Sequence, residues 1–510
     1  MSRPPTPAPP QPARETLHRW LLAGGIFAVL LFFFSPSWGA FSLWSRVPEM
    51  SGMLEVRRGV SVLEQVAHPG AEIADPLHRV IQWRLLFPLV GHVLHLPVPL
   101  FFGLAYAGVL AALAFVVTLL RRRGVAWRDC AFATVALGAG SWVFVSTGWL
   151  GYWDAWLALG LLVTAFARDR RWMWAACLWA PWADERFVLA APLALLCRWI
   201  LAYTEEPTQR FDWVREFLVP GVLLAAFAGV RLGVLAHQST SGATLTGYLG
   251  SQDFLNAPLS RIVLGVWDGL RAAWLWVGAA VFLLWRHGPA VLRPAAWLLA
   301  GVVLVIIAAG LATAQDYSRS MTMVLPVAVL GLLLAFRFAA QTRWLSHALA
   351  IAAAAALLLP AHHVMNDRVN PIFYLYRELA ALDIPPRVAM PEIHELQAIH
   401  EMERGEYAAA EADLTLAIKL SANPASPAKQ RGILLASQGR WADALRDFST
   451  MVEYDPTNPD AWFMRAQAQL ATGKPAAARS DLDRALALAP AGWSARPDVT
   501  RFLAKLNRTL

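Results

Sequence analysis

Long apolar runs fill most of the first 361 residues and restrict that region to helices. Runs of spanning length begin at Trp20 and recur at about 97–120, 129–148, 149–167, 214–236, 262–285, 294–313, 320–338 and 345–361. About 20 apolar residues cross a bilayer as a helix, and backbone polar groups in lipid must be satisfied within the segment itself. The sequence therefore predicts a membrane domain over residues 19–361, consistent with 57% hydrophobic and only 16% charged residues in the chain.

Residues 172–203 differ from the other apolar runs, because Asp184, Glu185 and Arg186 interrupt them. A charged triplet is costly in lipid unless it reaches an aqueous cavity or the headgroups. We therefore expect a hairpin of two helices here. With it the count reaches about eleven segments, and the predicted fold class is an all-α polytopic bundle.

Basic residues in the loops predict the orientation of the segments. Arg121, Arg168, Arg210, Arg286 and Arg337 belong to loops that fall on one side when the N-terminus is cytoplasmic, as the positive-inside rule requires. Residues 1–18 are then a disordered cytoplasmic segment, and residues 45–84 form the first outer loop. An odd number of segments puts a linker at 362–390 and everything after it outside the membrane. We expect a bacterial inner-membrane protein with a periplasmic tail.

A 34-residue period marks the C-terminal part of the chain. The period relates Gly405, Gly439 and Gly473, and it recurs in three further sets: Ala410, Ala444 and Ala478; Leu414, Phe448 and Leu482; and Ala417, Met451 and Ala485. Pro456 and Pro490 close two of the units, whereas the first unit has Ala422 there. Residues 391–490 thus resemble three tetratricopeptide (TPR) repeats, whose helix pairs stack into a solenoid.

The resemblance implies a soluble α-solenoid that binds a protein or peptide partner. A capping helix is expected over 491–510, where Val499, Phe502, Leu503 and Leu506 share one face. A short array that only packs on the membrane domain is the alternative. Nearly equal numbers of acidic and basic residues from Pro391 onward argue against nucleic acid as a partner.

Charged residues of the membrane domain gather on the predicted outer side. They are Glu72, Asp75 and Arg84 in or after the first outer loop, Asp154, the triplet Asp184, Glu185 and Arg186, and finally Asp316 and Arg319. Snorkelling charges have no reason to favour one side, whereas a polar cavity at the outer surface would collect them. The sequence predicts such a site.

This architecture resembles the GT-C superfamily of membrane glycosyltransferases, and with terminal repeats it is similar to the transmembrane and TPR-containing O-mannosyltransferases. The resemblance implies a polyprenyl-phosphate-linked sugar as donor. Asp75, or else Glu72, would then be the general base. Arg84, Arg186 and Arg319 would bind the phosphate, while Asp154, Asp184 and Asp316 would position the acceptor or a divalent cation. Glu185 is counted with them as a substrate-binding residue. The residues predict no dedicated metal site and name no other cofactor.

Simpler roles compete with these assignments. Asp75 is also suited to capping a helix, Arg84 and Arg319 to snorkelling, and Asp184, Glu185 and Arg186 to forming a neutral turn. Asp268 and Arg271 have the spacing of a local ion pair. Two other functions remain open. One is a non-catalytic, membrane-anchored TPR scaffold, and the other is an oligosaccharide ligase or polymerase.

Overall fold

The chain forms two compact units in the computed structural model. The first comprises Met1–Trp38 and Glu55–Ala380, and the second comprises Gly39–Leu54 and Ala381–Leu510. The structure describes residues 12–46, 51, 54–71, 73, 78, 81–206, 211–237, 257–339, 343–366, 368–372, 375, 391–421, 423–490 and 492–509. The predicted base residues Glu72 and Asp75 therefore lie outside the described residues, as does Ala422.

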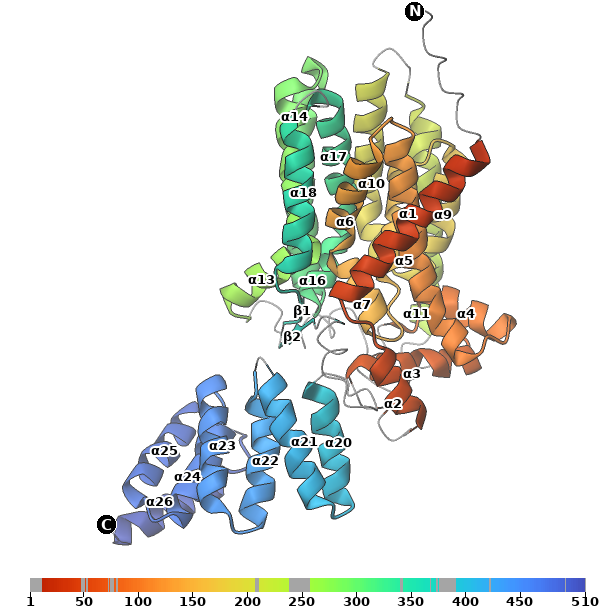
Figure 1. Cartoon of the computed structure of the whole chain (residues 1–510). Helices are drawn as coiled ribbons and strands as arrows, with labels where there is room; N and C mark the ends of the chain where they lie inside the picture. The colour runs from red at the N-terminus through yellow and green to blue at the C-terminus, as the bar shows by residue number, and fades with distance from the viewer. Residues whose placement is uncertain are drawn as a thin grey trace, which may run out of the picture. The chain divides into compact units, whose positions relative to one another are not determined.

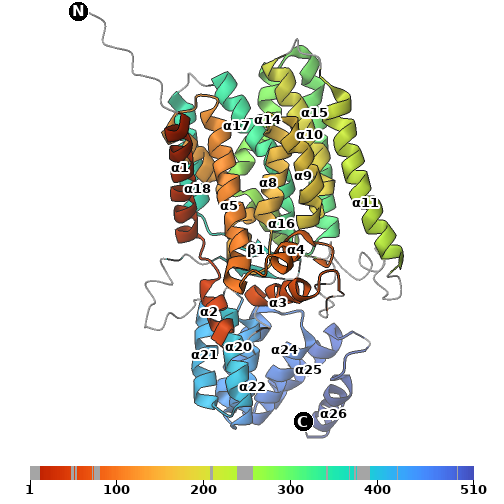
Figure 2. The ribbon, with the colours of Figure 1, turned by 90° about the vertical axis from the view of Figure 1, so that its right-hand side faces the viewer.

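The first unit is a bundle of helices that run back and forth between two ends (Figures 1 and 2). Its first half contains α1 (Pro12–Phe33), α3 (Leu54–Ala67), α4 (Leu86–Val93), α5 (Val98–Arg121), α6 (Trp127–Gly138), α7 (Ser141–Gly148), α8 (Asp154–Phe166), α9 (Arg170–Ala183) and α10 (Arg186–Glu205). The second half contains α11 (Val219–His237), α13 (Leu259–Leu270), α14 (Trp274–His287), α15 (Arg293–Thr313), α16 (Tyr317–Ser320), α17 (Leu325–Ala339) and α18 (Arg343–Leu358). Helix α2 (Trp38–Arg46) falls in the second unit except for Trp38.

Among the residues that the structure describes, six stretches are long and apolar enough to cross a membrane, or seven if a bent pair counts as one span. The six are Arg14–Phe33, Val98–Arg121, Arg186–Glu205, Leu259–His287, Ala290–Ala312 and Tyr317–Phe338. The bent pair is α6 with α7, which meet at 64° and replace the straight helix expected over 129–148. Helix α8 is apolar but shorter than the run 149–167. The total of eleven segments therefore stays a prediction.

The helices of the first unit pack along their lengths. Helix α5 packs against α1 and α8, and α8 packs against α9 and α10. Helix α14 packs against α15 and α17, while α18 packs against α6. A break at Asp184 and Glu185 separates α9 from α10, as the charged triplet predicted.

A small β-hairpin follows α18, where the sequence predicted only a linker. Strand β1 (His362–Val364) pairs antiparallel with β2 (Val369–Pro371), and β1 packs against α13 and α16. The predicted linker thus begins as an ordered part of the first unit. The hairpin lies at the end of the bundle that carries α7 and α16 (Figure 1).

The second unit contains three helix pairs and a final helix, as the 34-residue period predicted. The pairs are α20 (Pro391–Glu403) with α21 (Tyr407–Leu420), α22 (Ala425–Ser437) with α23 (Trp441–Tyr454), and α24 (Pro459–Ala471) with α25 (Pro475–Leu488). Gly405, Gly439 and Gly473 occupy the turns within the pairs at φ of +78°, +77° and +75°. Only glycine adopts this conformation without strain, which explains its period.

The residues that recur with the period form the core of the solenoid. Ala410, Ala444 and Ala478 are fully buried, so each pair of helices can approach closely. Helix α26 (Arg496–Thr509) buries Val499 and Leu506 against the third repeat, and Phe502 and Leu503 pack beside them. The last repeat therefore has its apolar face covered, as a stacked array requires.

Candidate functional site

Seven of the predicted site residues meet at one end of the first unit. We call this set the charged cluster: Arg84, Asp154, Asp184, Glu185, Arg186, Asp316 and Arg319. Arg84 precedes α4, Asp154 begins α8, and Asp184 to Arg186 lie at the break between α9 and α10. Asp316 and Arg319 come from the start of α16. Segments more than 200 residues apart thus supply one connected set of side chains.

Asp154 is the centre of the charged cluster and is fully buried. Its Oδ1 accepts a hydrogen bond from Arg186 Nη2 at 2.6 Å. Both of its oxygens accept from Arg319 Nε at 3.1 Å, and Oδ2 also accepts from Arg319 Nη2 at 2.9 Å. One carboxylate therefore holds two arginines, which ties α8 to α10 and α16.

Arg84 connects the end of the first outer loop to the same centre. Its Nε and Nη2 donate to the two carboxylate oxygens of Glu185 at 2.8 and 2.9 Å. Its Nη1 lies 2.8 Å from Oδ2 of Asp184. Asp184 in turn accepts from the side chain of Arg186 at 2.9 and 2.7 Å and from its backbone N–H at 3.1 Å. That last bond satisfies a free donor at the start of α10.

Asp316 extends the charged cluster toward the β-hairpin. Its carboxylate accepts from Arg319, and Oδ1 lies 3.1 Å from Nε2 of His363. Burial opposes ionisation of Asp316, but Arg319 and His363 outweigh it and hold the pKa of this carboxyl below its ordinary value. The ring of His363 also packs edge-on against Trp149, 4.6 Å between centroids.

Arg58 on α3 lies beside the charged cluster, and sequence reasoning missed it. The residue is 5% exposed, its Nε donates to the backbone oxygen of Gly151 at 3.1 Å, and its guanidinium lies 4.0 Å from the ring centre of Tyr152. The guanidinium of Arg319 lies 4.4 Å from the same ring centre. Within the described part of the chain, Nη2 of Arg58 has no hydrogen-bond partner and no carboxylate pairs with the guanidinium.

The surroundings of Arg58 disfavour its charge. Burial lowers its pKa to about 10, and the nearby charges of Arg319 and Arg84 contribute in the same direction. The three arginines of the charged cluster face four carboxylates, so Arg58 brings the formal sum to zero. That balance acts at a distance, because each carboxylate already contacts another arginine. An anion placed at Nη2 would stabilise the charged form of Arg58.

A second buried network lies where α18 ends. Arg271 is fully buried and pairs with Asp268 at 3.0 Å, as its spacing predicted. It also donates to the backbone oxygens of Ala356, Leu359 and Pro360. Ala356 lies in the last turn of α18, and Leu359 and Pro360 follow it, so Arg271 supplies donors to carbonyls at the end of this helix. Arg271 adopts φ +52°, an unfavourable backbone conformation for a side chain of this size, and its contacts hold it there.

The charged cluster has little capacity left for a metal. Within the described residues, no group of three or more His, Cys, Asp or Glu side chains is placed to hold a metal ion. His92 and His95 come as close as 6.4 Å between ring centroids, and His92 uses its Nδ1 on the oxygen of Val66. The carboxylates of the charged cluster form ion pairs with arginines instead.

The TPR repeats carry their own regular ion pairs. Arg431 pairs with Asp447 through two bonds of 2.9 and 2.6 Å, and Arg465 pairs with Asp481 through bonds of 2.6 and 2.8 Å. Each pair joins the two helices of one repeat, and the two pairs are related by the 34-residue period. In the first repeat, Asp413 instead contacts Nδ1 of His394 at 2.9 Å.

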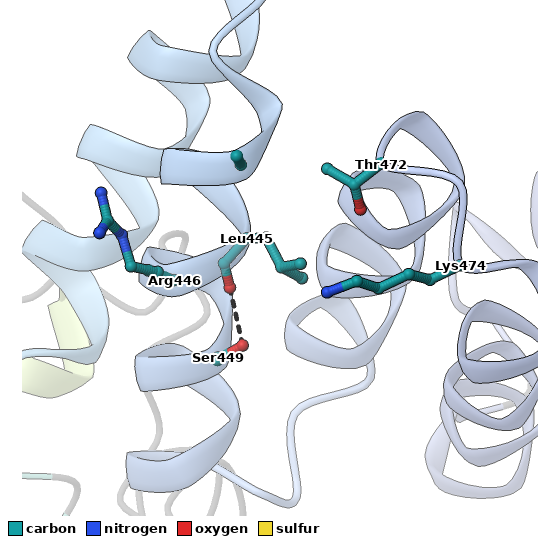
Figure 3. A pocket seen from close by; sticks show the side chains of 6 residues that line it. Leu445, Arg446, Ser449, Thr472 and Lys474 are labelled. Atoms are coloured by element: carbon teal, nitrogen blue, oxygen red, sulfur yellow. Dashed lines mark hydrogen bonds between the residues drawn. The ribbon is translucent and has the colours of Figure 1, made fainter.

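A small surface pocket lies between the second and third repeats. It encloses about 420 Å³ and is lined by Leu445, Arg446 and Ser449 of α23 and by Thr472 and Lys474 before α25, with Ala442 (Figure 3). The side chain of Lys474 points across it toward α23 (Figure 3). Arg446 pairs with Asp443. The pocket therefore has a basic edge and an apolar floor.

Comparisons with known proteins bear only on the second unit. A family model described as tetratricopeptide repeat matches residues 429–492. Among solved structures, the chain is similar to the first TPR of Spaghetti (RPAP3) bound to HSP90 peptide SRMEEVD. That match has 19% identity and a TM-score of 0.22, and it covers 23% of this chain and 91% of that one. No match was found among curated proteins. The C-terminal part is thus a TPR array, a type of module that binds proteins.

Proposed function

We propose that the first unit is embedded in a membrane and transfers a sugar from a polyprenyl-phosphate donor at its outer face. In this proposal the TPR repeats bind the acceptor or a partner protein. Membrane location is supported by the many apolar side chains on the surface of the first unit, such as Leu304, Val305 and Ile351, which are 66–69% exposed. Exposed apolar side chains in this number are suited to contact with lipid rather than with water.

The observation that carries the transferase proposal is the Nη2 of Arg58, for which the described residues supply no hydrogen-bond partner. Phosphate is the ligand that an arginine fork recognises best, through two parallel charge-assisted hydrogen bonds. The Nε of Arg58 donates to the backbone oxygen of Gly151, and Tyr152 covers one face of the guanidinium. A phosphate at Nη2 would gain the attraction of Arg58 and of the nearby Arg319 and Arg84. The leaving phosphate of a lipid-linked sugar carries the charge that this position favours.

The charged cluster itself then has a positioning role in this proposal. Arg84, Arg186 and Arg319 are each held by carboxylates, so they shape the site and orient Arg58 and Tyr152 rather than bind the donor first. Asp75, with Glu72 second, stays the proposed general base for the acceptor hydroxyl. Both belong to the segment between α3 and α4, the same loop that ends at Arg84.

The alternative is a non-catalytic scaffold that anchors the TPR repeats to the membrane. The neutralised arginines favour it, because a closed set of ion pairs is also what a structural core would need. In a scaffold, Arg58 would be a buried arginine whose charged group binds no ligand. The two functions therefore predict different effects of a substitution at Arg58.

A transfer assay separates the two functions. Membranes that contain the full chain would be incubated with radiolabelled polyprenyl-phosphate mannose, and in parallel with the glucose donor, and label in the protein and glycan fractions would be counted. We expect Arg58→Gln to lower transfer about ten-fold or more, since hydrogen bonds to charged groups contribute about 1.5–3 kcal/mol. Arg57→Gln, on the exposed side of the same helix, is the matched control and should stay near wild type.

The base assignment is tested in the same assay. Asp75→Asn should abolish transfer, and Glu72→Gln should do so if Glu72 is the base instead. Full transfer in both variants would contradict the assignment. No transfer by the wild-type chain from either donor, with intact binding of a partner by the TPR repeats, would favour the scaffold.

A further inference from the structure

A cavity lies at the end of the bundle opposite to the charged cluster. It is a groove of about 680 Å³ between α1, α5, α8 and α9. Its walls come from Trp20 of α1, from the second half of α5 and of α8, and from the start of α9. Because α5 packs between α1 and α8, the groove runs along helices that the apolar pattern assigns to the membrane. Its volume is in the range of ligand sites.

The groove is apolar along its length and basic at one end. Small and branched side chains line the interior, including Ala111, Ala114 and Val163. Trp20 and Trp172 stand at the sides and are 48% and 66% exposed. Tryptophans with one exposed face are typical of the depth at which lipid headgroups lie. The shape and lining suit a flexible hydrocarbon chain.

Two arginines line the basic end. Arg122 ends α5, and Arg168 follows α8. Among the residues that the structure describes, no carboxylate pairs with either one, although most neighbouring arginines are paired: Arg123 with Glu205, Arg170 with Asp212 and Arg198 with Glu216. Asp169 also lines this end, but its carboxylate accepts the backbone N–H of Arg171 and begins α9. The lining therefore keeps a net positive charge.

We propose that this groove binds a phospholipid with an anionic headgroup. An acyl chain lies along the apolar interior, and the headgroup phosphate lies between Arg122 and Arg168. Basic pockets between membrane helices on the cytoplasmic side are suited to such headgroups, and the positive-inside rule assigns this end to that side. The proposal rests on the membrane location proposed above, but not on sugar transfer.

The test is native mass spectrometry of the full chain in detergent, titrated with phosphatidylglycerol or phosphatidylcholine. The wild-type chain should retain phosphatidylglycerol preferentially. Arg122→Gln and Arg168→Gln should each reduce that preference about five-fold, which corresponds to about 1 kcal/mol per basic residue near a membrane surface. Arg128→Gln is the matched control, because Arg128 is exposed at the same end and contacts Asp129 instead. It should keep the preference.

A second variant tests the apolar part. Ala111→Trp fills the groove and should reduce retention of both lipids while leaving the order of their affinities. Equal retention of the two lipids by the wild-type chain, or an unchanged preference in the double arginine variant, would overturn the proposal. Release of the chain from membranes by alkaline carbonate would overturn both this proposal and the membrane location. Selective lipid binding without any sugar transfer would contradict the transferase alone.

Discussion

Both units of this chain contain ion pairs between arginine and a carboxylate, but the two units arrange these pairs differently. In the TPR repeats, the two pairs that follow the 34-residue period are isolated and local: Arg431 and Asp447 are 16 residues apart, and so are Arg465 and Asp481. In the first unit the pairs share partners, and Asp154 alone contacts Arg186 and Arg319. Loss of an isolated pair affects only its own two helices, whereas loss of a shared partner leaves two buried arginines with one carboxylate fewer each.

Burial strengthens this difference. The arginines of the TPR pairs are more than a fifth exposed as side chains, and water screens part of their charge. Asp154 and Asp184 are fully buried, and Arg319 is 4% exposed. Buried pairs add little net stability, but breaking one by removing a partner is costly. Variants in the two units should therefore differ several-fold in effect.

The largest effect is expected from Asp154→Asn, which keeps the size of the side chain but removes its charge. Arg186 and Arg319 would stay buried without full compensation, a cost of about 3–5 kcal/mol. Thermal unfolding of the detergent-solubilised chain, followed by size-exclusion chromatography, measures this loss. Asp129→Asn is the control, since the partners of Asp129 among the described residues are the exposed Arg128 and Ser346. Equal melting of Asp154→Asn and wild type would show that the shared pairs do not hold the unit together.

A smaller effect is expected for an isolated TPR pair. A double-mutant cycle of Arg431→Ala and Asp447→Ala should give a coupling energy of about 1 kcal/mol. Urea unfolding of residues 391–510, followed by circular dichroism, provides the four free energies. The cycle of Arg465 and Asp481 should agree with it, because the geometry repeats. A coupling as large as that expected for Asp154 would remove the contrast between the units.

Substitution of a turn glycine should lower the free energy of unfolding by about as much as loss of one TPR ion pair, or by less. Gly439→Ala places a Cβ in the left-handed region and should cost about 1 kcal/mol, although nothing stands within 4 Å of that Cβ. Gly492→Ala has equal space and no positive φ, so its cost should be near zero. The same urea experiment compares them. Equal costs would show that backbone strain does not explain the 34-residue period of glycine.

The smallest effect concerns Glu395, whose pKa burial raises above its ordinary value although Ser426 donates a hydrogen bond to it. A raised pKa in the folded state means that the folded protein favours the protonated form. Its contribution is fully present below the ordinary pKa of the carboxyl and is lost as pH rises through the folded value. Glu395→Gln should therefore stabilise residues 391–510 slightly at pH 7 and have less effect near pH 4. A larger gain at pH 4 would contradict this sign.

The sequence predicted the two units unequally well. The repeats follow from local features: glycine turns, small core residues and a fixed period. The prediction of the charged cluster depended on which side of the membrane each loop was assigned to. The prediction that Asp154, the Asp184 triplet and Asp316 face one end agrees with their contacts. Arg58 was missed because its environment comes from Gly151 and Tyr152, more than 90 residues away. His363 was missed because 362–390 read as a linker. The period that relates Asp413, Asp447 and Asp481 was a usable signal for the TPR pairs.

Direct binding of a polyprenyl phosphate to the full chain in detergent tests the role of Arg58 most closely. The wild-type chain should bind it, and Arg58→Gln should bind about ten-fold or more weakly, while Arg57→Gln stays unchanged. The double variant of Arg122 and Arg168 should also keep this affinity, because its groove lies at the other end of the bundle. Equal affinity of Arg58→Gln and wild type would contradict the proposal that the buried guanidinium beside the charged cluster binds the phosphate of the donor.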